Sequence, residues 1–254
     1  MTMRLLRDVA LIASLAALVS VVVRAREPGT FPLNTLLRQW FSRRPSRALL
    51  LVGAVAGVAS VVVVPLIGLL GGWAQIAPTG APSFRWVALA CAGVAVKTAF
   101  VLFEELIFRG ALVSELRRWT HPAVAVGVSA AVFAAAHSGR SFVDMVILFV
   151  DGIGFALAFV ATGSLWIPGA WHVSKNLSVW LFIGTGTIDL THGPFEVQYV
   201  GAEWLFGSAG GAGLLDLAVT TVIVGVVIRN LLNQRSGDEG CLTRHAADGA
   251  SRRG

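Results

Sequence analysis

Residues 48–72 constrain the fold of this chain more than any other stretch. They read ALLLVGAVAGVASVVVVPLIGLLGG and contain no charged side chain. A helix needs about 20 predominantly apolar residues to cross the hydrocarbon core of a bilayer. The whole chain has the same character, because 56% of its 254 residues are hydrophobic and 13% are charged, whereas a soluble domain is about 25% charged. The sequence therefore predicts an integral membrane protein, with the lipid bilayer as a partner.

Apolar segments recur along the chain and predict an all-α, polytopic membrane helix bundle. We expect about seven transmembrane helices, within a range of six to eight, around a polar cavity. For the first segment we favour a retained helix over a cleaved signal peptide, because Arg24 and Arg26 follow it with no small-residue cleavage site. The segments lie at about 8–23, 48–71, 86–108, 122–137, 142–162, 165–185 and 212–232.

Arginines are spread unevenly between these segments. Residues 24–47, the loop with Arg117 and Arg118, and the tail are rich in arginine, whereas residues 186–211 contain no Lys or Arg. With seven helices the rich segments share one side, which the positive-inside rule assigns to the cytoplasm. We therefore predict a cytoplasmic C-terminus and an N-terminus outside. Because the arginines cluster in loops and form no stripe, the net charge of +6 does not indicate a nucleic-acid partner.

The predicted organisation has three parts. Residues 1–47 hold an N-terminal transmembrane helix and a basic cytoplasmic segment, residues 48–235 hold the main bundle, and residues 236–254 form a disordered polar tail.

Ionisable side chains inside spanning helices cost about 2.5–3.5 kcal/mol each, so they are candidates for function. The stretch FEELIFRG carries Glu104, Glu105 and Arg109. Glu105 and Arg109 have the i, i+4 spacing of a helical ion pair, which would make the helix end tolerable near the membrane boundary. Glu104 points about 100° away from Glu105 and is free to face another helix.

Three further polar side chains lie in later apolar segments. His137 follows Phe133 by four residues, and His172 and Asn176 have the same spacing on one helical face. Taken alone, His137 is typical of a residue at the membrane interface. The pair of His172 and Asn176 is equally typical of hydrogen bonding between helices.

Other embedded charges allow a structural interpretation as well. We expect Lys97 to neutralise Asp144 or Asp151 on another helix, and Lys175 to extend its amine toward the interface.

Two chemistries fit a convergence of Glu104, His137, His172 and Asn176. In the first, Glu104 is a general base, His137 helps to hold the attacking water, and His172 and Asn176 donate to an oxyanion. In the second, His137, His172 and Glu104 bind Zn²⁺, and the metal activates the water. The chain has no HExxH motif, so zinc is a cofactor that the ligand types allow without requiring it.

The motifs EExxxR (Glu104, Glu105, Arg109), FxxxH (Phe133, His137) and HxxxN (His172, Asn176) occur in this order within residues 86–190. Together they closely resemble the CPBP family of CAAX-processing and bacteriocin-processing intramembrane endopeptidases. The resemblance implies a protease in which Glu104 activates water with His137, while His172 and Asn176 stabilise the oxyanion. It implies structural support from Glu105, Arg109 and Phe133. Both a metalloendopeptidase and a glutamate mechanism are argued for this family.

The resemblance leaves the substrate open between a prenylated CAAX-type peptide and another membrane-associated peptide or protein. The Arg-rich, Lys-poor composition suggests a bacterial protein of the inner membrane. Two alternatives do not require the catalytic site. A bacteriocin-immunity protein would sequester a peptide without cleaving it, and an ion-coupled transporter would use Lys97, Asp144 and Asp151 as its pathway.

Overall fold

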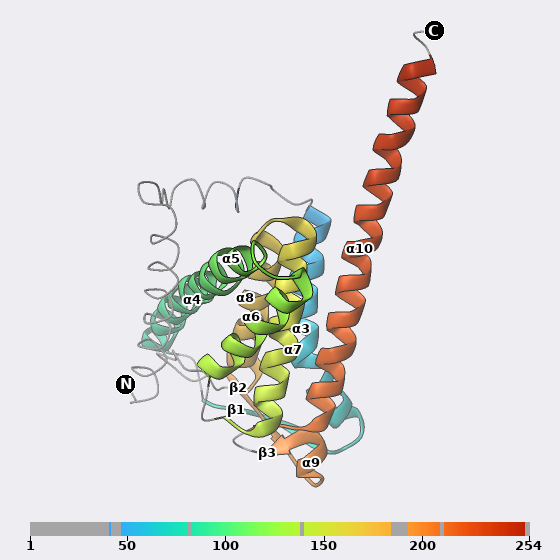
Figure 1. Cartoon of the computed structure of the whole chain (residues 1–254). Helices are drawn as coiled ribbons and strands as arrows, with labels where there is room; N and C mark the ends of the chain where they lie inside the picture. Colours follow the sequence, from blue (N-terminus) through green and yellow to red (C-terminus); the bar gives the residue numbers. More distant parts are fainter. Residues whose placement is uncertain are drawn as a thin grey trace.

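The computed structural model describes residues 41, 47–80, 83–137, 140–183, 193–208 and 211–251, with side chains described in the last range from residue 212 to residue 233. The predicted helix at 8–23 lies outside these residues, as does nearly all of the basic segment that follows it. Helices dominate the described chain, as predicted (Figure 1). They are α3 (Arg47–Leu70), α4 (Phe84–Glu105), α5 (Ser114–Leu116), α6 (Pro122–Ala136), α7 (Phe142–Thr162), α8 (Trp166–Ser178), α9 (Glu203–Phe206) and α10 (Leu214–Ser251), with π-helices η1 (Leu106–Val113) and η2 (Val179–Ile183).

Four of the described helices are long and apolar enough to cross a membrane. They cover Arg47–Leu70, Phe84–Leu116, Phe142–Thr162 and Leu214–Asn233, and Pro122–Ala136 is a shorter apolar helix. Every apolar segment predicted beyond residue 47 contains a helix. The prediction of a helical membrane bundle is confirmed.

The packing of α3 against α8 is the most extensive in the bundle, and small residues make it close. A Cβ atom at Gly53 would lie 2.9 Å from the carbonyl oxygen of Ile167, and one at Gly57 would overlap the backbone of Trp171. Glycines four residues apart allow helix backbones to approach in this way inside a membrane. The consequence for function is that α8, which carries His172, is held against α3.

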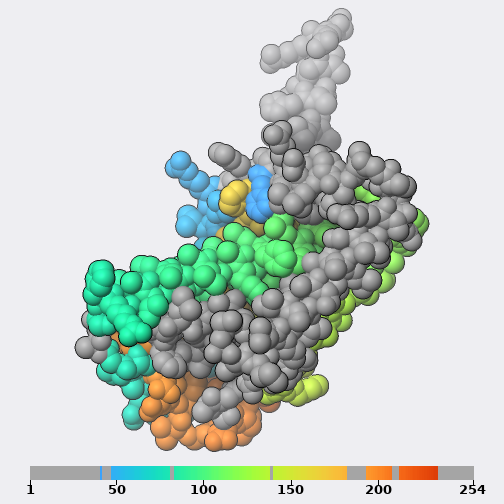
Figure 2. Space-filling view, turned by 90° about the vertical axis from the view of Figure 1, so that its left-hand side faces the viewer, coloured from blue at the N-terminus to red at the C-terminus, as the bar shows by residue number. Residues whose placement is uncertain are grey.

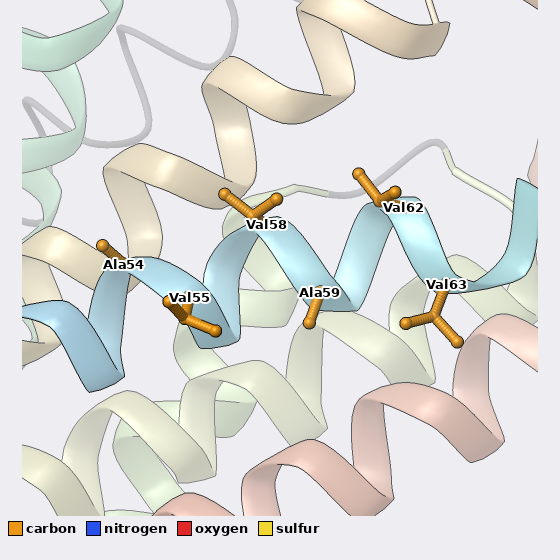
Figure 3. Close-up of a pocket in the computed structure, with 6 residues that line it drawn as sticks. All are labelled: Ala54, Val55, Val58, Ala59, Val62 and Val63. Carbon is orange, nitrogen blue, oxygen red and sulfur yellow. The ribbon is translucent and has the colours of Figure 1, made fainter. Parts of the chain in front are cut away.

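The opposite face of α3 carries a shallow apolar groove of about 320 Å³. Figure 3 shows that its six lining side chains all come from this one helix. They are Ala54, Val55, Val58, Ala59, Val62 and Val63. This groove has no polar lining and is not the polar cavity that the sequence predicts.

Helix α4 runs across one face of the molecule (Figure 2). Its buried residues are Ala90, Gly93, Lys97, Val101, Glu104 and Glu105, which recur at helical spacing and form one stripe. The chain then continues through η1 and α5 to Leu116, whereas the sequence predicts that this helix ends at about residue 108. Arg109 therefore lies within a longer helical stretch, because its ion pair lets the chain stay helical inside the bundle.

Two small antiparallel sheets are the part of the fold that the sequence does not predict. In the first, β1 (Ala74–Pro78) pairs with β2 (Phe195–Tyr199), with Ala74 opposite Tyr199. In the second, β3 (Gly207–Ser208) pairs with β4 (Gly211–Ala212). Strands of two to five residues produce no alternating pattern long enough to recognise.

Helix α10 extends past the rest of the bundle to Ser251 (Figure 1). The structure thus has helix over residues 236–251, where the sequence predicts a disordered tail. Extending an existing helix avoids the cost of nucleation, and no proline interrupts this stretch. The boundaries at residues 47 and 235 remain predictions.

Candidate active site

Glu104, His137 and His172 meet inside the bundle, although they come from three different helices. The Nε2 atom of His137 lies 3.6 Å from Oε1 of Glu104, and the Nε2 atom of His172 lies 3.6 Å from Oε2. Glu104 projects from the buried stripe of α4, with a side chain that is 3% exposed. The convergence that the sequence predicts for these three residues is therefore present in the structure.

A hydrogen bond on the other ring nitrogen orients each imidazole. The Nδ1 atom of His137, at the C-terminal end of α6, lies 2.8 Å from the carbonyl oxygen of Phe133. The Nδ1 atom of His172 lies 2.7 Å from Oε1 of Glu105. A carbonyl and an ionised carboxylate only accept hydrogen bonds, so both Nδ1 atoms carry the proton. In the neutral rings both Nε2 atoms are then acceptors that face the Glu104 carboxylate, which suits a hydrogen-bond donor such as water between them.

Glu105 and Arg109 form the ion pair that their spacing predicts, with 3.0 Å between Nη1 and Oε1. The pair does not lie at a helix end, because the helical stretch Phe84–Leu116 continues past it, and the two side chains are 1% and 0% exposed. The guanidinium lies 4.3 Å from the ring centroid of Phe133 and 5.0 Å from that of Phe155. Cation–π contacts of this kind partly compensate the buried charge. The ion pair is confirmed, and its predicted location is corrected.

Glu105 has a second role that the sequence did not reveal, because it also holds His172. In a histidine-based site, a carboxylate on Nδ1 fixes the ring orientation and stabilises the imidazolium when it forms. Spacing along one helix can predict the contact between Glu105 and Arg109, but the contact with α8 depends on how the helices pack.

Aromatic rings fill the space around the two histidines. Phe133 lies 4.7 Å from the ring of His137 and 5.7 Å from that of His172, measured between centroids. Phe155 of α7 stacks on His172 at 4.8 Å with an interplanar angle of 20°. The FxxxH spacing singles out Phe133, whereas nothing in the sequence distinguishes Phe155 from the other phenylalanines.

Asn176 lies one helical turn after His172. Its Nδ2 atom donates a hydrogen bond to the backbone carbonyl of His172 at 3.2 Å. This bond holds the side chain along α8 and engages one of the two amide hydrogens, which leaves a second donor on the same nitrogen.

The other embedded charges are arranged differently from the prediction. Lys175 does not extend toward the interface, because its Nζ atom lies 2.5 Å from Oδ2 of Asp151 on α7. Asp144 caps the start of α7 with Ser141 and accepts a hydrogen bond from the backbone of Ala212 at 3.0 Å. Both aspartates thus have other partners, and the expected pairing of Lys97 with one of them stays a prediction. Because Lys175 pairs with Asp151, this aspartate gives less support to the alternative of an ion-coupled transporter.

Zinc is the cofactor that the sequence allows at Glu104, His137 and His172. Across the described ranges, no group of three or more His, Cys, Asp or Glu side chains is placed to hold a metal ion. Zinc binding by Glu104, His137 and His172 stays a prediction, and the chemistry below is derived through side chains and water.

Comparison with known proteins agrees with the motifs. The sequence model of the family described as type II CAAX prenyl endopeptidase Rce1-like matches residues 84–178. No curated protein and no solved structure matches the chain. The matched interval begins with α4 and ends with α8, so it contains all three motifs and the elements that bring Glu104, His137 and His172 together. Through this interval, the chain is similar to the Rce1-like type II CAAX prenyl endopeptidases.

Proposed function

We propose that this protein is an endopeptidase that cleaves a membrane-associated peptide with Glu104 as the general base. The observation that carries the proposal is the position of Glu104 between the Nε2 atoms of His137 and His172, at 3.6 Å from each. A buried carboxylate beside two oriented imidazoles suits abstraction of a proton from water.

The first half of the proposed reaction forms a tetrahedral intermediate. Glu104 takes one proton of a water molecule, while Nε2 of His137 accepts a hydrogen bond from the other. The water oxygen bonds to the carbonyl carbon, and the carbonyl oxygen becomes an oxyanion. For this step His172 carries a second proton, which it takes from solvent before the reaction and keeps throughout, and as an imidazolium it donates to the oxyanion from Nε2 while the carboxylate of Glu105 stabilises it at Nδ1. The remaining amide hydrogen of Asn176 is a second donor.

The second half breaks the peptide bond. The carbon–nitrogen bond breaks as the intermediate collapses, and Glu104 returns its proton to the leaving amine. The products are an amine and a carboxylic acid, which then releases its proton to the amine or to water, and Glu104 is again ionised. Glu104 thus serves as base and then as acid, which requires the same carboxylate to reach both the water and the leaving group.

Replacement of Glu104 by Gln tests this role, because the amide keeps the shape of the side chain and cannot accept the proton. We expect Glu104→Gln to lower kcat by at least about 100-fold, which lies within the usual contribution of a general base. Cleavage of a fluorogenic peptide by purified protein in detergent measures it. The control is Glu115→Gln, at a partly exposed acid in α5. Full turnover by Glu104→Gln would remove Glu104 from the mechanism.

For the substrate we propose a CAAX-type peptide in which the cysteine before the cleaved bond carries a prenyl group. The matched family supports this class through its description. Parallel assays of peptides with S-farnesylcysteine and unmodified cysteine test it, and equal kcat/KM values would instead indicate an unlipidated substrate.

We propose a bacterial inner-membrane location with the arginine-rich ends in the cytoplasm, which cysteine labelling from either side of the membrane would test.

Removal of metal distinguishes direct action of Glu104 on water from the zinc alternative. If Glu104 acts directly on water, dialysis against a chelator leaves kcat unchanged, and purified active protein contains less than one equivalent of metal. Loss of activity on chelation, with recovery on addition of Zn²⁺, would support the metalloendopeptidase mechanism instead.

A further inference from the structure

Arg140 is an exposed cation in the short connection between α6 and α7. Three residues before it, His137 ends α6 with its imidazole beside Glu104, and the next residue, Ser141, caps the start of α7. Three peptide steps of about 3.8 Å place the Cα atom of Arg140 within about 11 Å of that of His137. Its charge interacts with the Glu104 carboxylate. Arg140 therefore lies at the rim of the proposed catalytic site.

The two arginines that interact with Glu104 differ in what they can bind. Arg109 is fully buried and holds Glu105. Lys175, one turn from His172, is occupied by Asp151. Arg140 is exposed at the rim, so an anionic group of an entering substrate can reach it.

We propose that Arg140 binds the C-terminal carboxylate of the peptide substrate and so selects substrates that end a few residues beyond the cleaved bond. This inference rests on the proposed endopeptidase function. A CAAX-type substrate ends three residues after its cysteine, and three extended residues span at most about 10–11 Å. This longest reach is about the same as the largest possible distance between the Cα atoms of His137 and Arg140. The planar guanidinium of arginine binds carboxylates through two parallel hydrogen bonds, which provides geometric selection as well as charge.

The test uses two peptides that differ only at the C-terminus. Each carries S-farnesylcysteine followed by three aliphatic residues, and one ends in a free acid while the other ends in an amide. We expect the wild-type protein to prefer the acid by about 10- to 100-fold in kcat/KM, mainly through KM, because a hydrogen bond to a charged group is lost with the amide. Arg140→Gln should lower the acid to the level of the amide and leave the amide unchanged. Arg140→Lys should keep part of the preference.

Arg85→Gln is the matched control, because this exposed arginine lies about 28 Å before Glu104 along the same helix. It should retain the wild-type preference. Equal cleavage of acid and amide by the wild type would overturn the proposal, as would a preference that survives in Arg140→Gln. Equal loss for both peptides would also overturn it and would indicate a general electrostatic or lipid contact instead.

A binding measurement separates this proposal from the proposed catalysis. Fluorescence anisotropy of both labelled peptides with Glu104→Gln, and with the same variant carrying Arg140→Gln, reports carboxylate recognition without turnover. Tighter binding of the acid that requires Arg140 supports the inference even if Glu104 is not the base. Equal affinity for acid and amide contradicts it even if cleavage depends on Glu104.

Discussion

At the scale of single residues, the two adjacent glutamates occupy different environments because about 100° of helical rotation separates them. Glu104 faces the Nε2 atoms of both histidines, whereas Glu105 contacts Arg109 and the Nδ1 atom of His172. His172 therefore lies between the two carboxylates. Glu105, which pairs with Arg109, and Glu104, the proposed base, thus both lie next to the imidazole ring of His172.

Replacing Glu105 by Gln should lower both stability and activity. The change leaves the Arg109 charge buried without its partner, which costs about 3–5 kcal/mol in comparable cases, and it removes the carboxylate that stabilises His172. We expect a lower melting temperature in detergent and a reduced kcat. The double variant Glu105→Gln, Arg109→Met should recover stability but not kcat, and recovery of both would mean that Glu105 serves only Arg109.

Phe133→Leu should reduce kcat more than it reduces stability, because Phe133 packs against the rings of both histidines. Buried substitutions that change side-chain shape cost about 1–3 kcal/mol. Phe103→Leu is the control, since Phe103 belongs to the same chain segment as Glu104 but is 45% exposed. Parallel melting curves and kcat values would show the difference, and similar kcat values for the two variants would contradict a positioning role for Phe133.

At the scale of helices, the site depends on how closely α8 packs against its neighbours. The space for a side chain at Gly57 is taken by Trp171 and Ser174, both on the helix that carries His172. We therefore expect Gly57→Leu to separate α3 from α8, destabilise the protein by about 1–3 kcal/mol and lower kcat. Gly225→Ala is the control, because a Cβ atom there meets nothing within 4 Å. Wild-type activity in Gly57→Leu would show that the site tolerates movement of α8.

The Asp151–Lys175 pair joins α7 to α8, with side chains that are 4% and 15% exposed. Asp151→Asn alone should destabilise the protein, because it leaves the lysine charge without its partner. Adding Lys175→Met should restore much of the loss, since replacing a buried pair by apolar groups is often neutral. A double-mutant cycle on melting temperature measures the coupling, and additive losses would mean that the two side chains do not stabilise each other.

At the scale of the whole molecule, α10 contributes to the core through its first half. Val224, Val227 and Leu231 are buried against residues of α7 and α8, including Phe155 and Trp171. Phe155 in turn stacks on His172. The C-terminal helix therefore supports the site through residues that it packs against, such as Phe155.

Truncation of the chain tests where the bundle ends. We expect removal of residues 236–254 to leave the melting temperature and kcat near wild-type values, because the buried side chains described in α10 end at Leu231. Removal of residues 224–254 should unfold the bundle or lower its stability severely, because it deletes three core residues. Loss of activity in the shorter truncation would show that the polar end of α10 takes part in function.

Particular residues show how far the sequence predicts the site. The motif positions of Glu104, His137 and His172 were recognisable from residue type and order, and the ion pair of Glu105 with Arg109 followed from spacing along one helix. The contacts of His172 with Glu105, of Phe155 with His172 and of Lys175 with Asp151 were not predictable, because each joins two helices. The same limit explains why Lys175 was expected to extend toward the interface.

The sequence by itself determined that this chain spans a membrane as helices, because bilayer hydrocarbon requires long apolar segments with their backbone groups bonded internally. It also determined which polar residues are candidates for chemistry, because charges in such segments are costly and need a reason to persist. Tertiary structure alone decided which candidates meet and which atoms face one another. Close packing at Gly53 and Gly57 and the rings of Phe133 and Phe155 set the rotation and depth of each helix, and these cannot be derived from periodicity along a single segment.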